Sequence, residues 1–331
     1  MDKININKWA NFILQHPNGN AFQSPEFYKL YRNYSKYEPI IVYTEENDSI
    51  TGILLAVIQK EHSGIIGRFS ARSIIIGGPI IKNNDPLYLH EIMAKYFNAI
   101  KGKVIYTQFR NLWDWTDLKS VFETHKFKYD EHLDILIDLT DVNKLEQGIS
   151  KNKKRNIIKG QNKGLIFREI QTEKEYYEGI MLILNTYKKI GLPCPSREYF
   201  ELSYKEFFPS ALLKTFGAFI EDRLIGVRME LIFKDIIYDW YAGADEKMNN
   251  KYPNDFLIYN ILLWGHEHNY KTFDFGGAGK PNKPYGVRDH KLKFSNNLVE
   301  FGRFEYIHKP CLFIFGKIGL KFYKLINDIR K

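Results

Sequence analysis

The sequence predicts an α+β protein made of two similar modules in tandem, each organised around a mixed sheet. Segments with helical and with strand periodicity alternate along the whole chain, as they do in domains that combine both elements. The 331 residues exceed what one hydrophobic core usually organises. Both halves repeat one order of elements: an antiparallel meander, a helix, and a strand that ends in glycines. That repeated order predicts a divergent duplication.

The composition indicates a well-packed globular protein with an anionic partner. Hydrophobic residues make up 44% of the chain and the formal charge is +9. Such a charge favours phosphates, tRNA or an acidic lipid surface, although a solvated basic surface gives the same balance. The two cysteines, Cys194 and Cys311, exclude a disulfide scaffold and a structural zinc site. Without a secretory signal or an apolar run of about 18 residues, we expect a cytoplasmic protein.

In the first half, two short helices precede a hairpin. Ser24 and Pro25 form a sound N-cap and first-turn pair for the second helix. A third strand ends on Gly77-Gly78-Pro79, and Asp85-Pro86 starts the long helix that follows. The expected helices are 5–15, 24–34 and 85–102, with a short one before the last strand, and the expected strands are 38–45, 50–61, 72–81, 103–112 and 131–139.

The second half repeats this plan after a basic helix. Thr172 and Glu175 form a capping box for its long helix. Three closely spaced strands then form a meander, and Asn254-Asp255 starts the next helix. The expected helices are 142–163, 172–191, 196–208 and 254–270, and the expected strands are 164–170, 212–222, 223–233, 236–245 and 272–277.

These patterns divide the chain into a first module, residues 1–141, and a second module, residues 142–331. The second module contains an ordered loop, 276–294, rich in glycine, proline and cations, which we expect to approach an anionic or carbonyl group closely. The basic, amphipathic segment 312–331 is expected to be a C-terminal helix. Docking on its own domain and peripheral contact with the cytoplasmic face of the membrane both fit that pattern.

The order and spacing of several motifs carry a family resemblance. The second half reads YDWYAGAD, then YPNDFLIYNILLWGHEH, then FDFGGAG and a lysine–phenylalanine pair, and KKRNIIKGQNKGL forms the basic helix that begins the module. In this order the chain resembles the FemABX family of peptidoglycan interpeptide-bridge aminoacyltransferases, whose members consist of tandem GNAT-like (acyl-CoA N-acyltransferase) modules. The resemblance covers essentially the whole chain and implies two GNAT-like modules here.

The resemblance implies a site lysine at residue 291. The family has a lysine in a Phe-Lys-x-x-Phe-Gly context after the last glycine-rich turn, and this chain reads HKLKFS over residues 290–295. Lys291 matches that lysine, whereas His290 and Ser295 depart from the pattern. The acyl group in this family comes from an aminoacyl-tRNA or, in relatives, from acyl-CoA, so the resemblance implies a co-substrate and no tightly bound cofactor.

The acyl donor is expected near two turns. The long helical arm of the family's best-known tRNA users is missing, and so is the CoA pyrophosphate signature. The helix start at Asn254 and Asp255 remains a candidate anion site because its N–H groups are unpaired. Gly276 and Gly277 allow close backbone approach. These four residues are the expected donor-binding positions.

The remaining candidates are polar residues set among apolar neighbours. Lys291, Asp274 and Tyr241 are the expected catalytic residues, with Lys291 as a fixed cation that stabilises an oxyanion. Because a buried aspartate must be paired, Arg288 is the expected partner of Asp274. The expected substrate-binding residues are Arg288, Arg228, Asp239, Tyr285, Arg110 and Arg72. No metal site is expected, because His266 and His268 point in different directions on a helix.

The sequence therefore supports three hypotheses. The first is transfer of an aminoacyl group onto an amine of a lipid- or nucleotide-linked cell-envelope precursor, with tRNA as a partner. The second is an acyl-CoA-dependent N-acyltransferase that acts on a sugar amine or an exopolysaccharide precursor. The third is a protein of the same fold that binds such a precursor without catalysis. Proximity alone can supply about 7–11 kcal/mol to acyl transfer, so no covalent nucleophile is needed.

Overall fold

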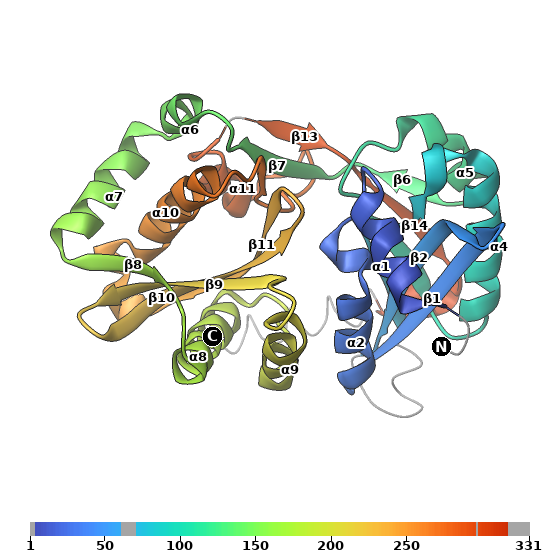
Figure 1. The fold of residues 1–331 in the computed structure, drawn as a ribbon, viewed down its shortest axis with the longest axis horizontal. Helices are drawn as coiled ribbons and strands as arrows, with labels where there is room; N and C mark the ends of the chain where they lie inside the picture. The colour runs from blue at the N-terminus through green and yellow to red at the C-terminus, as the bar shows by residue number, and fades with distance from the viewer. Residues whose placement is uncertain (1–3, 61–70, 296, 317–331) are drawn as a thin grey trace. The chain divides into compact units, whose positions relative to one another are not determined.

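A computed structural model describes residues 4–60, 71–295 and 297–316. The chain divides into two compact units, residues 1–131 with 301–331 and residues 132–300, which we call unit 1 and unit 2. The expected boundary at 141 falls instead after a strand that belongs to unit 2, and the end of the chain returns to unit 1. Figure 1 shows the elements of both units.

Unit 1 has one sheet in the strand order β1-β2-β3-β5-β14-β6, with β4 paired to β2. Helices α1 and α2 contact β2 and β1, and α4 packs on the same two strands through residues such as Ile92. The strands are β1 (Tyr37–Glu46), β2 (Ser49–Gln59), β3 (Arg72–Ile76), β4 (Ile80–Ile81), β5 (Tyr106–Arg110), β6 (Lys128–Asp130) and β14 (Arg303–Ile307). The helices are α1 (Ile6–Gln15), η1 (Ala21–Gln23), α2 (Pro25–Asn33), η2 (Lys82–Asn84), α4 (Pro86–Ile100), η3 (Thr116–Leu118) and α5 (Lys119–Thr124).

Unit 2 has a sheet in the order β13-β7-β12-β11-β10-β9-β8. Helices α8 and α9 lie on one face of this sheet, and α10 with α7 lies on the other (Figure 1). The strands are β7 (Leu133–Asp138), β8 (Leu165–Glu169), β9 (Leu213–Ile220), β10 (Arg223–Phe233), β11 (Ile236–Ala244), β12 (Thr272–Asp274) and β13 (Leu298–Glu300). The helices are α6 (Val142–Gly148), α7 (Lys151–Asn162), α8 (Glu173–Ile190), α9 (Arg197–Phe207), η4 (Glu246–Lys251), α10 (Pro253–Glu267) and α11 (Gly286–Lys291).

The two units share one topology. In each unit, a long antiparallel hairpin is followed by a third strand that pairs antiparallel with the hairpin. A helix then leads to a strand that lies parallel to the third one. These three elements are β3, α4 and β5 in unit 1, and β11, α10 and β12 in unit 2. The repeated order expected from the sequence is therefore present, and the α+β class with mixed sheets is confirmed.

Each sheet is completed by a strand from a distant part of the chain. β14 follows the whole of unit 2 in sequence but lies between β5 and β6 of unit 1. β7 follows directly on unit 1 but lies between β12 and β13 of unit 2. These two long-range insertions explain why the division at residue 131 precedes the boundary expected at 141.

Three expected segments differ in the structure. The basic helix expected over 142–163 is two helices, α6 and α7, separated at Ile149 and capped anew by Ser150. Helix α11 forms inside the loop expected over 276–294, because the prolines and most of its glycines precede Gly286. A helix begins at Pro310, but residues 317–331 of the expected C-terminal helix lie outside the described residues.

Candidate functional site

The site is built where the parallel strands β11 and β12 separate. β12 pairs with β11 only through Ile236–Thr272, Ile237–Phe273 and Tyr238–Asp274, whereas β11 continues to Ala244. The chain leaves β12 through Gly276, which has a left-handed φ of 72°. A side chain there would lie 3.9 Å from the carbonyl oxygen of Asp239 on β11. Glycine thus lets the backbone turn beside the diverging strand.

Lys291, at the end of α11, is tied to this turn. Its Nζ donates to three successive carbonyl oxygens, those of Phe275, Gly276 (3.0 Å) and Gly277 (3.3 Å). The ammonium also lies 5.1 Å from the centre of the Phe275 ring. Burial lowers the pKa of Lys291, while the nearby carboxylates of Asp239 and Asp134 act in the opposite direction. The structure therefore joins Lys291 to Gly276 and Gly277, three of the residues expected at the site.

Arg288 holds the loop that leads to Lys291. Its guanidinium donates to the carbonyl oxygens of Ala278 (3.3 Å), Lys280 (2.7 Å) and Lys283 (2.6 Å). Arg288 is the partner expected for Asp274, but the hydrogen bonds from its two terminal nitrogens go to these backbone oxygens instead. It orders the loop, and that order in turn fixes where α11 starts.

A buried ion pair lies beside Lys291. Arg228 on β10 is 4% exposed and donates to Asp239 on β11 and, at 3.4 Å, to Glu230. Glu230 is fully buried, and its Oε2 has no hydrogen-bond partner among the described residues. Burial and the Asp239 charge raise the pKa of Glu230 well above its usual value. Burial and the neighbouring negative charge therefore favour the protonated, neutral form of this carboxyl group.

Asp274 is the second buried acid of the site. It is 5% exposed, and its Oδ1 accepts a hydrogen bond from the Gly276 N–H at 2.8 Å. Burial and the neighbouring Asp134 raise its pKa well above the usual value, against the opposing influence of that N–H and of Lys291. Asp274 thus shapes the turn that presents its carbonyls to Lys291.

A β-bulge places Tyr241 away from these groups. Met229 pairs with Tyr241 and Glu230 with Asp239, so Trp240 is an extra residue in β11. After the bulge the alternation reverses: the Tyr241 ring contacts Tyr187 of α8 at 5.8 Å and Phe200 of α9 at 4.9 Å.

In a regular strand Asp239 and Tyr241, which are two residues apart, would share a face. The structure instead brings Asp239 to Arg228 and packs Tyr241 among the aromatic rings of α8 and α9. Tyr187 contacts the Tyr241 ring and also lies near the ion pair. Burial raises the pKa of its hydroxyl, and the charges of Asp239 and Arg228 act on that pKa in opposite directions.

The start of α10 is occupied by a carboxylate of the chain itself. Asp255 lies in the first turn and accepts hydrogen bonds from Lys153 Nζ (2.5 Å) and Asn156 Nδ2 (2.9 Å), both on α7. Lys153 also contacts His290 Nδ1 at 3.1 Å, and burial next to this ammonium lowers the pKa of His290 to about 4. Asp255 thus joins α7 to α10, while the N–H groups at the start of α10 have no side-chain cap among the described residues.

Asn254, the neighbouring residue, faces a different environment. It lines a cavity of about 560 Å³ between α8 and the segment that links β11 to α10. The charged side chains at this cavity are largely paired: Lys189 with Glu246, and Asp245 with Arg223 at 2.6 Å. The cavity has room for the extended arm of an acyl thioester, and of its two lysines Lys189 is paired with Glu246 whereas Lys247 has no ion pair among the described residues.

The remaining expected residues lie in separate places. Tyr285 is the N-cap residue of α11 and packs over Gly279, where a Cβ would lie 3.0 Å from its ring. Arg72 and Arg110 belong to unit 1, where they donate to Gln59 (3.1 Å) and Gln108 (2.9 Å). The described structure therefore gives these two arginines structural partners within their own sheet.

Sequence reasoning missed Glu230, Lys153 and His290. Glu230 lies in the apolar run GVRMELIF, and a glutamate inside such a strand is a usable signal for a buried carboxyl group. Lys153 belongs to the charge run 151–155, a pattern that fits contacts to phosphates but is usually a solvated helix face. Its spacing to Ile157 and Gly160, both buried, places it on the inner face of α7 and could have identified it.

With this geometry described, comparison with known proteins identifies the fold. A family profile described as acetyltransferase (GNAT) domain matches residues 152–291, which lie within unit 2. This part of unit 2 is thus similar to a GNAT acetyltransferase domain. The diverging β11 and β12, the bulge and the helix α10 all fall within the matched residues.

Solved structures extend the similarity to the whole chain. FemX is 13% identical, with a TM-score of 0.74, over 94% of this chain and 98% of that one. The C-terminal domain of a proposed lysylphosphatidylglycerol synthetase from Agrobacterium fabrum is 12% identical, with a TM-score of 0.60 and 95% of each chain covered. A tandem GNAT protein from the clavulanic acid pathway is 9% identical, with a TM-score of 0.52, over 91% of this chain and 94% of that one.

These similarities confirm the expected fold, two GNAT-like units in tandem. No curated protein matches the sequence. Within the described ranges, no helix is both long and apolar enough to cross a membrane. The same residues contain no group of three or more His, Cys, Asp or Glu side chains that could hold a metal ion.

Proposed function

We propose that the protein transfers an aminoacyl group onto an amine of a cell-envelope precursor. The observation that carries the proposal is the Lys291 ammonium, held against the carbonyls of residues 275–277 where β11 and β12 separate. Support comes from the likeness to FemX and to the proposed lysylphosphatidylglycerol synthetase domain, together with the FemABX-like order of motifs.

In this proposal the acceptor amine attacks the ester carbonyl of the aminoacyl donor. The C–N bond forms, the carbonyl oxygen becomes an oxyanion, and Lys291 exchanges a backbone carbonyl for that oxyanion as its acceptor. Asp239, whose side chain is 13% exposed and bound to Arg228, orients the amine. Collapse of the intermediate breaks the C–O bond, and the proton lost by the amine passes to the departing hydroxyl oxygen. A fixed donor at an oxyanion is worth roughly 10²–10³ in rate.

The groups that could bind the acyl donor favour an aminoacyl ester over acyl-CoA. A diphosphate needs free cations or a free helix N-terminus. Here Lys153, which contacts the first turn of α10, is already bound to Asp255, and Lys189 is paired with Glu246. The cavity beside Asn254 supports acyl-CoA as the second candidate donor, because it could receive the arm of a thioester.

The test is a transfer assay with radiolabelled aminoacyl-tRNA and a nucleotide- or lipid-linked muropeptide. We expect labelled acceptor with the unaltered protein and a loss of about 10²–10³-fold in rate with Lys291→Ala. Lys293→Ala is the matched control, because Lys293 is exposed and two residues further along the chain. Absence of transfer with every amino acid would refute the tRNA-dependent function. Unchanged transfer by Lys291→Ala would remove the assigned role.

A thermal-shift comparison separates the donors. A shift with acetyl-CoA that is lost in Asn254→Ala would support the second candidate, whereas a shift only with an aminoacyl-tRNA analogue supports the first. If neither donor reacts but the muropeptide binds, and Lys291→Ala merely weakens that binding, the protein is a binding module of the same fold.

A further inference from the structure

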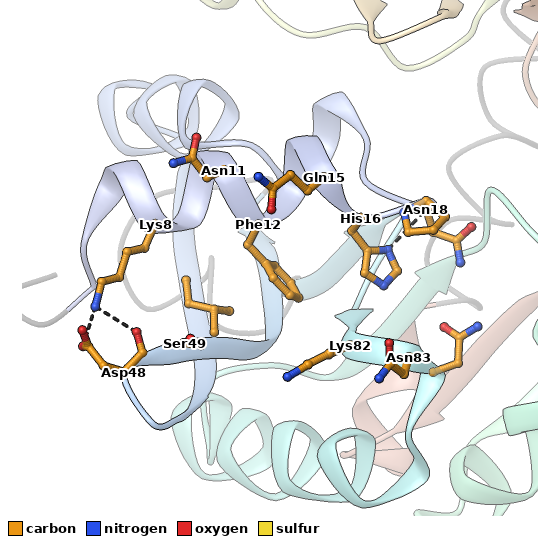
Figure 2. Close-up of a pocket in the computed structure, with 13 residues that line it drawn as sticks. Lys8, Asn11, Phe12, Gln15, His16, Asn18, Asp48, Ser49, Lys82 and Asn83 are labelled. Carbon is orange, nitrogen blue, oxygen red and sulfur yellow. Dashed lines mark hydrogen bonds and ion pairs between the residues drawn. The ribbon is translucent and has the colours of Figure 1, made fainter.

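Unit 1 contains a cavity that the proposed transfer reaction does not use. It has a volume of about 650 Å³, within the range of small-molecule sites. Its walls are α1, the turn after α1, the β1–β2 turn and η2 (Figure 2). None of these residues belongs to unit 2, which contains the Lys291 cluster.

The walls of this cavity are fixed to one another. Lys8 on α1 forms an ion pair with Asp48 in the β1–β2 turn and also donates to its carbonyl oxygen at 2.9 Å. His16 Nδ1 accepts the N–H of Asn18 at 3.1 Å, so its Nε2 carries the proton and donates to the carbonyl oxygen of Ile81 at 2.8 Å. The inner face of α1 is anchored by Trp9, which is fully buried. The cavity is therefore a preformed feature of the fold.

Five carboxamide side chains line the cavity: Asn11, Gln15, Asn18, Asn83 and Asn84. None of these five side chains makes a hydrogen bond within the part of the chain that the structure describes, so their donors and acceptors are available to a ligand. Each carboxamide offers two N–H donors and a carbonyl acceptor, which matches the hydroxyl and acetamido groups of sugars.

The other lining groups complete this chemistry. Phe12 reaches from α1 into the space between the walls, with Gln15 above and Lys82 below it in Figure 2. Its half-buried ring offers an apolar face of the kind that packs on the C–H face of a pyranose. Lys82 has no ion pair among the described residues, whereas Lys8 and Asp48 neutralise each other. The lining suits a neutral ligand or one with a single acidic group.

The backbone of η2 supports a binding role. Asn83 and Asn84 both have left-handed φ values, 55° and 52°, in consecutive positions. The similar pair Asn47 and Asp48 forms the two-residue hairpin turn between β1 and β2, which requires that conformation. No hairpin register requires it at η2. Backbone in sparsely populated regions gathers at ligand sites, and here both residues line the cavity.

We propose that this cavity of unit 1 binds a saccharide, a mono- or disaccharide that is neutral or carries one acidic group. Carboxamides from α1 and η2 bind its hydroxyl and acetamido groups, Phe12 packs against one ring face, and Lys82 receives the acidic group where there is one. The site is independent of the transfer chemistry proposed for unit 2, so either can be refuted without the other.

The experiment is ligand-observed NMR and calorimetry on the full chain with N-acetylglucosamine and its β-1,4-linked disaccharide. Glycerol and inorganic phosphate are the counter-probes. We expect the sugars to bind and the double variant Asn83→Gly/Asn84→Gly to bind about tenfold more weakly, because two neutral hydrogen bonds are each worth a few-fold in affinity. Glycine accepts the left-handed backbone, so this variant should keep the fold.

Asn269→Gly is the matched control, because Asn269 is exposed, has a φ of 62° and lies in unit 2. It should leave saccharide affinity unchanged, while Phe12→Ala should lower it. The proposal is overturned if neither sugar binds, if glycerol or phosphate binds as well as the sugars, or if Asn269→Gly weakens binding as much as the double variant.

Discussion

The parallel strand pairs of the two units show why one topology has two different interiors. In unit 1, β3 and β5 pair over all five residues of each strand. Beside this closed pair lies a neutral network, in which Tyr96 donates to Ser73 at 2.6 Å and contacts Thr107 at 2.9 Å. In unit 2 the matching pair stops after three residues, and buried charges occupy the place where it opens. Opening the pair creates room for charged chemistry.

The first prediction removes the central charge of the opened pair. Arg228→Met leaves Asp239 and Glu230 without their guanidinium, and breaking a buried pair costs about 3–5 kcal/mol. Arg72→Met in unit 1 removes only a partly exposed bond to Gln59, so we expect a loss of about 1 kcal/mol or less. Urea unfolding of both variants measures the contrast. Equal losses of unfolding free energy would mean that the fold depends on Arg228 no more than on Arg72.

The second prediction concerns the close approach of α8 to β11. A Cβ on Gly243 would lie 2.5 Å from the backbone nitrogen of Ile183, so Gly243→Ala must displace the helix. Overpacking of this kind costs about 1–3 kcal/mol. Gly286→Ala is the control, because a Cβ there meets nothing within 4 Å, and its effect should stay within about 0.5 kcal/mol. Thermal unfolding monitored by circular dichroism compares them; a neutral Gly243→Ala would contradict the tight packing.

The third prediction uses the pH dependence of Glu230. Its folded-state pKa is raised, so between the unfolded pKa, about 4.3, and the folded one the native state binds the extra proton. Stability from this group is therefore present at low pH and is lost as pH rises through the folded pKa. Glu230→Gln removes that loss and should therefore be more stable than the unaltered protein at pH 8, by about 1.36 kcal/mol for each unit by which folding raises the pKa.

At pH 4 the advantage of Glu230→Gln should largely disappear. The Glu230 carboxyl group is then mostly protonated in the unfolded protein as well as in the folded one. Urea titrations at the two pH values measure this difference. A variant that is less stable at pH 8 would show instead that Glu230 is ionised and that its charge stabilises Arg228.

The smallest effect is expected in the neutral network of unit 1. Tyr96→Phe removes the hydroxyl that contacts Ser73 and Thr107, at a cost of about 1 kcal/mol. Because burial raises the pKa of Tyr96 and lowers that of His308, which contacts Thr107, to about 4, neither group titrates between pH 6 and pH 8 and the cost should not change there. Urea titrations at both pH values test this. A pH-dependent cost would mean that the network of unit 1 is not neutral and does not differ in this respect from the charged interior of unit 2.

Much of the fold follows from local sequence signals, and the site follows less completely. Periodicity and caps such as Ser24-Pro25 and Thr172 predicted most helices and the strands of both meanders. The placement of β7 and β14 depends on pairing between distant segments, which periodicity does not encode.

At the site, the glycine turn and Lys291 were predicted together and do contact each other. The bulge at Trp240 could not be predicted, because one extra residue in a strand leaves no local mark, and it moved Tyr241 to the other face. The partners of Arg288 were also missed, because an arginine that binds carbonyl oxygens of its own loop has no sequence pattern.

The exchange of β7 and β14 has a consequence for synthesis on the ribosome. The N-terminal segment emerges first, yet its sheet lacks an inner strand until residues 303–307 have left the exit tunnel. Unit 2, whose strands all lie between residues 133 and 300, is complete earlier. The order of maturation is thus the reverse of the order of translation, and a nascent chain stalled near residue 300 would expose the edges of β5 and β6 to chaperones or to aggregation.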